Sequence, residues 1–275
     1  MTRIAIFQSR TGIDPEANAE ALVEAIAAAA SGGAEMLFTP EMSGLLDRDS
    51  ERAAKCVRPA QEDVVLAACR AAARDKGIWL HLGSLAVTVE GNKLANRGFV
   101  IDSGGEIRAT YDKIHLFDVD LPTGESWRES NVYRGGSDAV VVGGTPVGRL
   151  GLTICYDLRF PQLFARLTDA GADVLSVPAA FTVPTGKAHW EVLLRARAIE
   201  AGVFVVAAAQ CGRHEDGRET YGHSLLVDPW GEILLDMGEQ VGVAFAELDT
   251  GKVEQVRQRV PAIRHRRAVG EALQR

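Results

Sequence analysis

Four residues of this chain have side chains that can do chemistry and also follow short apolar runs, namely Glu41, Lys113, Glu129 and Cys155. Cys155 is the most informative of them. It ends the apolar run 147–154 and precedes Asp157 and Pro161, which are typical of the start of a helix. A thiol at such a turn lies near unsatisfied backbone N–H groups and the positive end of a helix dipole. Both favour the thiolate, which attacks carbonyl or nitrile carbon, so we expect a reactive cysteine.

Together, these side chains supply what the hydrolysis of an amide needs. A carboxylate such as Glu41 can take the thiol proton as the nucleophile attacks. An ammonium such as Lys113 favours the thiolate and neutralises the oxyanion of the tetrahedral intermediate, and the backbone N–H of Tyr156 is a second donor to that oxyanion. Each residue alone has a simpler explanation: a surface carboxylate, a solvated lysine or a small buried hydrophobe. Only the combination predicts catalysis.

Short apolar runs that alternate with helical patterns are expected to position these residues. The expected strands are 4–7, 36–38, 78–87, 98–102, 107–111, 139–142, 147–154, 174–177, 203–208, 224–227, 232–235 and 243–248, and the expected helices are 15–30, 61–76 and 189–201. The alternation predicts an α/β fold, and three hairpin-like segments predict some antiparallel pairing. Polar residues at the ends of buried strands then meet at one rim of a sheet. Because we find no linker or repeat, we expect residues 1–275 to form one domain.

The composition argues against several classes of protein. The 275 residues are 47% hydrophobic and 24% charged, as in an ordinary soluble globular protein. With a net charge of -7 and no basic cluster before residues 264–267, no nucleic-acid partner is expected. The chain starts directly with a strand pattern, and its apolar stretches are too short for a bilayer, so no membrane partner is expected either. The four cysteines are widely spaced, which argues against a zinc site or a disulfide framework and favours the cytoplasm.

Three motifs occur in the order that is typical of the nitrilase (carbon–nitrogen hydrolase) superfamily, which the chain resembles over nearly its whole length. The motifs are Thr39-Pro40-Glu41, Tyr111-Asp112-Lys113-Ile114-His115-Leu116 and Gly151-Leu152-Thr153-Ile154-Cys155-Tyr156-Asp157. Segments 155–161, 189–200, 207–212 and 221–231 are similar to the Nit branch, in particular to the deaminated-glutathione amidases. The match is looser after Glu41, which leaves the pocket wall and the substrate open.

The resemblance implies a four-layer α-β-β-α sandwich and a set of catalytic roles. Glu41 is the implied general base, Lys113 the cation that stabilises the oxyanion, and Cys155 the nucleophile. Glu129 matches a further glutamate of the family that positions the lysine and the substrate, although it can also be an ordinary loop carboxylate. The reaction needs no metal and no organic cofactor. Members of the family pair through helices, so we expect a homodimer or a higher homo-oligomer.

Five residues near the motifs are candidates for substrate binding: Arg159, Phe181, Thr182, Thr185 and His189. Arg159 can bind a substrate carboxylate through its planar guanidinium, or it can pair with Glu200 or Asp157 to hold a helix. Segment 181–187 is expected to be a long loop that forms either the pocket wall or a purely structural connection. His189 opens the next expected helix, where packing or a hydrogen bond near the site is favoured over metal binding.

We therefore expect an amidase that hydrolyses a small, acidic, linear amide to an acid and ammonia through a cysteine thioester. The motifs do not separate a deaminated-glutathione amidase from an ω-amidase, a nitrilase or an N-carbamoyl hydrolase, because the attack is shared. Two other classes of protein stay open. A non-catalytic binding module would be expected to lose a member of the trio, and a redox-sensing thiol protein would need a resolving cysteine, for which Cys211 is a remote candidate.

Overall fold

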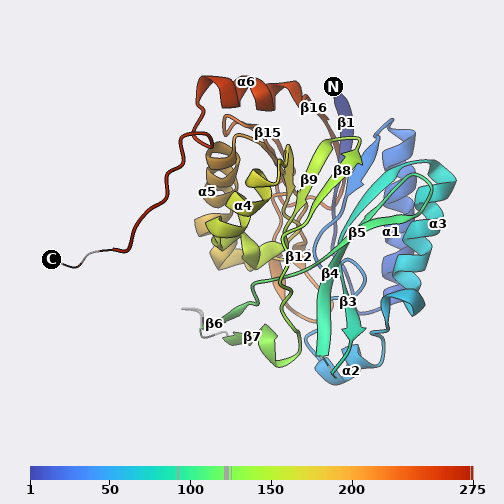
Figure 1. Cartoon of the computed structure of the whole chain (residues 1–275). Helices are drawn as coiled ribbons and strands as arrows, with labels where there is room; N and C mark the ends of the chain where they lie inside the picture. Colours follow the sequence, from blue (N-terminus) through green and yellow to red (C-terminus); the bar gives the residue numbers. More distant parts are fainter. Residues whose placement is uncertain (92, 121–123, 125, 273, 275) are drawn as a thin grey trace.

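Two six-stranded sheets form the centre of the protein (Figure 1). The computed structural model describes residues 1–91, 93–120, 124, 126–272 and 274. The first sheet has the order β16 (Gly242–Leu248), β1 (Thr2–Gln8), β2 (Met36–Phe38), β3 (Trp79–Val89), β4 (Lys93–Ile101) and β5 (Ile107–Asp112). The second has the order β15 (Ile233–Asp236), β14 (Leu225–Val227), β11 (Phe204–Ala207), β10 (Val174–Ser176), β9 (Gly148–Leu152) and β8 (Val141–Thr145). In each sheet three strands run parallel, β1 to β3 and β9 to β11, while the flanking pairs are antiparallel.

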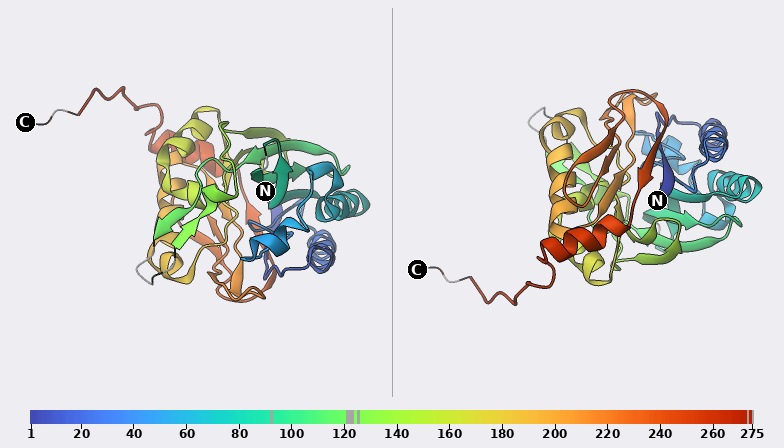
Figure 2. Two further views of the ribbon diagram at one scale, coloured as in Figure 1. Left: turned by 90° about the horizontal axis from the view of Figure 1, so that it is seen from below. Right: turned by 90° about the horizontal axis from the view of Figure 1, so that it is seen from above.

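Helices cover the outer face of each sheet, which gives four layers (Figure 2). The helices α1 (Pro15–Ser31) and α3 (Val64–Lys76) lie on the first sheet, and α4 (Pro161–Asp169) and α5 (Val183–Ala201) lie on the second. This arrangement confirms the α-β-β-α sandwich that the resemblance implied.

Strand β1 shows how the sequence builds the layers. Its side chains alternate between the two faces of the sheet, because successive residues of a strand point in opposite directions. Ile4 and Ile6 belong to the cluster that contains the second sheet, whereas Ala5 and Phe7 belong to the cluster beneath α1 and α3. Both faces of the sheet are therefore buried, which explains why the run is apolar throughout.

One predicted helix begins earlier than expected. Helix α5 starts at Val183, six residues before the predicted start at His189, so segment 181–187 is not a long loop. The reason is that Thr182 occupies the N-cap position and Pro184 lies in the first turn, where a proline costs no backbone hydrogen bond.

Several short elements have no counterpart among the predicted ones. They are α2 (Ser50–Ala54), the hairpin β6 (Asp118–Asp120) and β7 (Ser126–Arg128), the hairpin β12 (Cys211–Arg213) and β13 (Glu219–Tyr221), α6 (Gly251–Arg259), and three 3-10 helices, η1 (Ala60–Glu62), η2 (Glu129–Asn131) and η3 (Cys155–Arg159). After α6 the C-terminal segment extends away from the body (Figure 1). None of the described helices combines the length and the apolar character that a membrane span requires.

Candidate active site

The strand ends bring the candidate catalytic residues to one place. Glu41 lies three residues after β2, Cys155 lies three residues after β9, and Lys113 directly follows β5. Glu129 directly follows β7 as the first residue of η2. β2 belongs to the parallel part of the first sheet, and β9 belongs to the parallel part of the second sheet. The carboxyl ends of these two strands bring the carboxylate of Glu41 and the thiol of Cys155 to the same rim.

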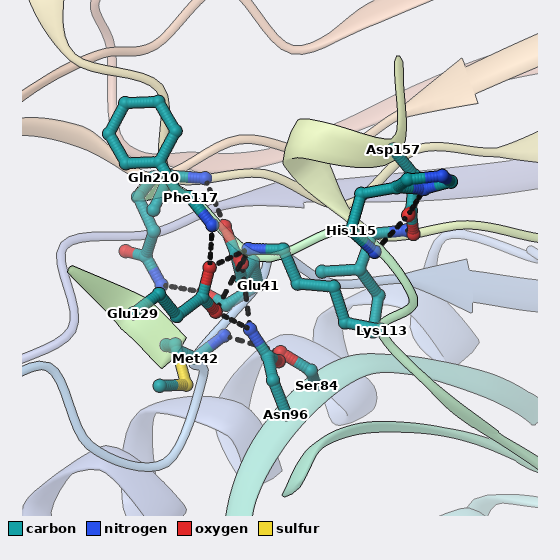
Figure 3. Close-up of polar contacts among 12 residues, drawn as sticks. Glu41, Met42, Ser84, Asn96, Lys113, His115, Phe117, Glu129, Asp157 and Gln210 are labelled. Atoms are coloured by element: carbon teal, nitrogen blue, oxygen red, sulfur yellow. Dashed lines mark hydrogen bonds and ion pairs between the residues drawn. The ribbon is translucent and has the colours of Figure 1, made fainter. Parts of the chain in front are cut away.

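A buried ammonium joins the two carboxylates (Figure 3). Lys113 Nζ donates to Glu41 Oε1 at 2.9 Å and to Glu129 Oε1 and Oε2 at 3.1 and 2.9 Å. The side chains of Lys113 and Glu41 are only 3% and 5% exposed. Burial disfavours the ammonium, but the charges of Glu129 and Glu41 outweigh it and raise the pKa of Lys113 well above its ordinary value. The two carboxylates therefore favour the charged form of the lysine.

The backbone around Glu41 is held from several sides. Gln210 Nε2 donates to the Glu41 carbonyl at 3.0 Å, and the N–H of Met42 donates to Ser84 Oγ at 2.9 Å. Met42 has a φ of 56°, an uncommon conformation for a residue with a side chain. Such a conformation persists only where the surroundings enforce it, so the carboxylate of Glu41 has a fixed direction.

Cys155 also adopts a left-handed backbone conformation, with a φ of 51°. Its N–H donates to the Pro178 carbonyl at 2.9 Å, which ties the cysteine to the segment after β10. Burial raises the pKa of the Cys155 thiol well above its ordinary value; the charge of Glu41 and a hydrogen bond to it act in the same direction, while Lys113 opposes them. Together these surroundings favour the protonated thiol over the thiolate.

The turn at Cys155 was expected to favour the thiolate, and the surroundings of the sulfur oppose that effect. The helix after Cys155 is η3, a 3-10 helix of five residues, and its dipole is small compared with a full carboxylate. Glu41 lies within hydrogen-bonding reach of the sulfur and disfavours a second negative charge next to it.

Asp157 connects the lysine segment to the cysteine segment. It is completely buried, and its Oδ2 accepts from the N–H of Ile154 at 2.9 Å and from the hydroxyl of Tyr111 at 2.7 Å. Its Oδ1 accepts from the N–H of His115 at 3.0 Å, and His115 Nδ1 lies 2.7 Å from the same oxygen. Asp157 thus caps the short helix η3, and it also fixes the distance between Lys113 and the nucleophile.

Arg159 lies against the aromatic rings beside Cys155. Its guanidinium carbon is 5.8 Å from the ring centroid of Tyr156 and 5.5 Å from that of Phe181, and its Nη1 is 3.3 Å from His189 Nδ1. These are cation–π contacts, which leave the edge of the guanidinium available to a ligand. Arg159, Phe181 and His189 therefore share one wall beside the nucleophile.

The alternative explanation for Arg159, an ion pair with Glu200 or Asp157, is wrong. Glu200 pairs with Arg197 at 2.8 Å, and Asp157 is bound as described above. No carboxylate among the described residues forms an ion pair with Arg159. Among the residues that the structure describes, this arginine is therefore a cation at the wall of the site that has no anionic partner.

Thr182 and Thr185 lie at the start of α5 and contact each other. Their Oγ1 atoms are 2.8 Å apart, and Thr185 Oγ1 also donates to the Thr182 carbonyl at 3.3 Å. The structure therefore gives both hydroxyl groups a local role in the first turn of the helix.

The sequence analysis missed Asn96 and the contact that Gln210 makes with Glu41. Asn96 lies on β4 and is 1% exposed, and Gln210 follows β11 and is completely buried. A signal existed in the sequence, because an amide inside an apolar strand is expensive unless it has partners. The pattern could not name those partners, since they lie 55 and 169 residues away.

The comparison with family models decides the identity of the chain. The model described as carbon-nitrogen hydrolase matches residues 3–258. The chain belongs to the carbon–nitrogen hydrolase family. This confirms the predicted superfamily and makes the protein an enzyme, an amidase that hydrolyses carbon–nitrogen bonds.

Relatives and solved structures agree with the family. The deaminated glutathione amidase of Bos taurus is 41% identical over 268 residues, which cover 96% of this chain and 81% of the relative. The crystal structure of the C. elegans NitFhit protein superimposes with a TM-score of 0.89 at 40% identity. The matched part covers 97% of this chain and 65% of the chain in that structure. An amidase from Nesterenkonia sp. AN1 superimposes with a TM-score of 0.78 at 28% identity, covering 95% of this chain and 98% of that one. It is described with acrylamide added to its active-site cysteine.

Proposed function

We propose that the enzyme hydrolyses deaminated glutathione or a closely related amide of a 2-oxo acid, with Cys155, Glu41, Lys113 and Glu129 as its catalytic residues. The observation that carries this proposal is the single lysine shared by two carboxylates beside a buried thiol. The identity to relatives named deaminated glutathione amidase over almost the whole chain supports the choice of substrate. We also propose that residues 1–275 act as one domain.

In the first half of the proposed reaction, Glu41 takes the proton of the Cys155 thiol while the sulfur bonds to the amide carbon. The carbonyl electrons move to oxygen, and the oxyanion is stabilised by Lys113 and by the backbone N–H of Tyr156, which lies in the first turn of η3. Glu41 then gives its proton to the nitrogen as the carbon–nitrogen bond breaks. The amine leaves, and a thioester remains on Cys155.

In the second half, a water molecule attacks the thioester carbon while Glu41 takes one of its protons. Collapse of the second tetrahedral intermediate breaks the carbon–sulfur bond, and the sulfur recovers its proton from Glu41. Lys113 does not exchange protons in either half, because its raised pKa keeps it charged. It acts by electrostatic stabilisation alone.

The proposed substrate changes one product that the sequence led us to expect. The scissile amide nitrogen of deaminated glutathione belongs to a cysteinylglycine unit, so hydrolysis gives 2-oxoglutarate and cysteinylglycine. Ammonia is the product only from a primary amide such as 2-oxoglutaramate. We propose that Arg159 binds a carboxylate of the substrate, while Phe181 and His189 line the pocket and Thr182 and Thr185 hold the start of α5 beside it.

We expect the purified enzyme to release 2-oxoglutarate faster from deaminated glutathione than from 2-oxoglutaramate. A coupled 2-oxoglutarate assay with both substrates measures this, because both share that product. We expect kcat/KM to differ by about tenfold or more, since a substrate that offers further groups to the site gains binding energy in the transition state. A panel of one nitrile and one N-carbamoyl amino acid is the control. Turnover of either at a higher kcat/KM than both oxo-acid amides would contradict the proposed substrate.

We propose further that the enzyme is a cytoplasmic homodimer that pairs through α5. Val192 and Ile199 are seven residues apart on one face of α5 and are 67% and 55% exposed, and Trp230 beside them is 56% exposed. Such a group of exposed apolar side chains favours a protein partner. Ile199→Glu should therefore convert a dimer into a monomer in sedimentation equilibrium, whereas a monomeric parent protein would contradict the proposal.

Four unpaired cysteines favour a reducing compartment, which fractionation of expressing cells would test.

A further inference from the structure

Asn96 contacts every charged residue of the catalytic cluster (Figure 3). Its Nδ2 donates to Glu41 Oε1 at 2.8 Å and lies 3.3 Å from Glu129 Oε1. Its backbone carbonyl accepts from the N–H of Lys113 at 2.9 Å, so strand β4 also carries the lysine. None of these contacts belongs to the reaction steps described above.

The orientation of the Asn96 amide is fixed by its surroundings. Turning the amide by half a turn would direct Oδ1 against two carboxylate oxygens, which cannot donate. In the orientation observed, Oδ1 is buried and has no hydrogen-bond partner among the described residues. An unsatisfied buried acceptor is unfavourable for the fold. The residue therefore serves the two glutamates rather than its own local structure.

The two carboxylate oxygens of Glu41 accept hydrogen bonds from different donors. Oε1 accepts from both Lys113 Nζ and Asn96 Nδ2, whereas Oε2 accepts from the backbone N–H of Ala180 at 2.9 Å. The same N–H of Ala180 also lies within hydrogen-bonding reach of the Cys155 sulfur. Oε2 thus shares its backbone donor with the thiol, and it has fewer donors than Oε1 to compete with an incoming proton.

We propose that Asn96 is a positioning residue that occupies Oε1 of Glu41 and so directs Oε2 toward the thiol as the proton acceptor. The inference rests on the proposed role of Glu41 as the general base. A neutral donor suits this task because the cluster already holds one ammonium between two carboxylates. A second cation at position 96 would make Glu41 a weaker base. An apolar residue there would leave Oε1 and Oε2 to compete for the proton.

The test compares Asn96→Leu with Asn96→Asp. Leucine keeps the volume without a donor, and aspartate keeps the shape but adds a third negative charge. We expect Asn96→Leu to lower kcat roughly 10²-fold with KM changed less than about threefold, since a misdirected base affects the transition state more than binding. The acid limb of its kcat/KM profile should move to higher pH, because a hydrogen bond that favours the charged base is lost. At alkaline pH, Asn96→Asp should be slower than Asn96→Leu.

Two controls separate the inference from fold effects and from the proposed function. Asn18→Ala removes another buried amide, which bonds only to the backbone of Gly12 and Gly44, and should lower the melting temperature without moving the pH profile. If Asn96→Asp does not fold, Asn96→Ala takes its place. The acid limb of its kcat/KM profile must then show the same shift to higher pH that is expected for Asn96→Leu. Unchanged kcat and acid limb in the folded Asn96 variants would overturn the inference. If Glu41→Gln retains turnover, the proposed base itself is wrong and the inference falls with it.

Discussion

Replacing Cys155 with alanine should abolish hydrolysis of the oxo-acid amide, with a loss in kcat of about 10⁴-fold or more. The methyl group cannot form the thioester, and the cluster of Glu41, Lys113 and Glu129 alone offers no other nucleophile. The fold should persist, because the change removes one buried sulfur atom and leaves the carboxylate–ammonium contacts intact. The raised pKa of the thiol affects the stability of the protein only at alkaline pH, where the unfolded chain would lose the proton first. At lower pH the alanine substitution should therefore not change the stability through this pKa.

Mass spectrometry of the quenched reaction provides the measurement. The parent enzyme should carry an added acyl group on the peptide that contains Cys155, and Cys155→Ala should carry none. Cys69→Ala is the matched control, because Cys69 is a buried thiol on α3 whose pKa burial raises to about 12. It should retain kcat while losing a little stability. Equal turnover by Cys155→Ala and the parent enzyme would rule out a thioester mechanism.

Glu41→Gln should lower kcat by about 10³-fold while making the thiol easier to alkylate at alkaline pH. The sign follows from the contacts of Cys155. Burial, the charge of Glu41 and the hydrogen bond to Glu41 all raise the pKa of the thiol, so removing the charge lowers that pKa. At a fixed alkaline pH a larger fraction of Cys155 is then thiolate. Turnover nevertheless falls, because glutamine can neither accept the thiol proton nor protonate the leaving amine.

The rate of modification of Cys155 by iodoacetamide, followed on its own peptide, separates these two effects. Glu129→Gln is the matched control, since it removes an equal charge from the same lysine without taking the base away from the sulfur. Its loss of kcat should come without a comparable gain in alkylation rate. If Glu41→Gln slowed alkylation at every pH, Glu41 would not be the group that holds the thiol neutral.

Much of the fold could be predicted from local patterns, because the layers depend on short-range alternation. The ends of the buried strands β1, β2 and β10 and of the helix α1 were predicted to within two residues. The start of α5 was missed, since Pro184 fits both a loop and a first helical turn. The packing of the helix against the second sheet decides between the two.

The chemistry of the site, like the fold, could be predicted from the sequence only in part. The order and type of Glu41, Lys113 and Cys155 were enough to predict an amidase, because acyl transfer needs a base, a cation and a nucleophile. The direction of the pKa shift of the Cys155 thiol could not be derived from the turn alone. It depends on burial and on a carboxylate that is 114 positions away in the chain, and no local pattern contains that distance.

The sequence by itself indicated the alternation of strands and helices and the set of candidate catalytic residues, because these depend on residue type and local spacing. The four-layer fold followed from the resemblance to the family. Only the tertiary structure decided that burial and Glu41 raise the pKa of the Cys155 thiol and that none of the described carboxylates pairs with Arg159. It also revealed that Asn96 binds both glutamates and that Asp157 joins the lysine and cysteine segments. These features arise where strands from two sheets end together, and electrostatic and hydrogen-bond energies depend on distances in space rather than along the chain.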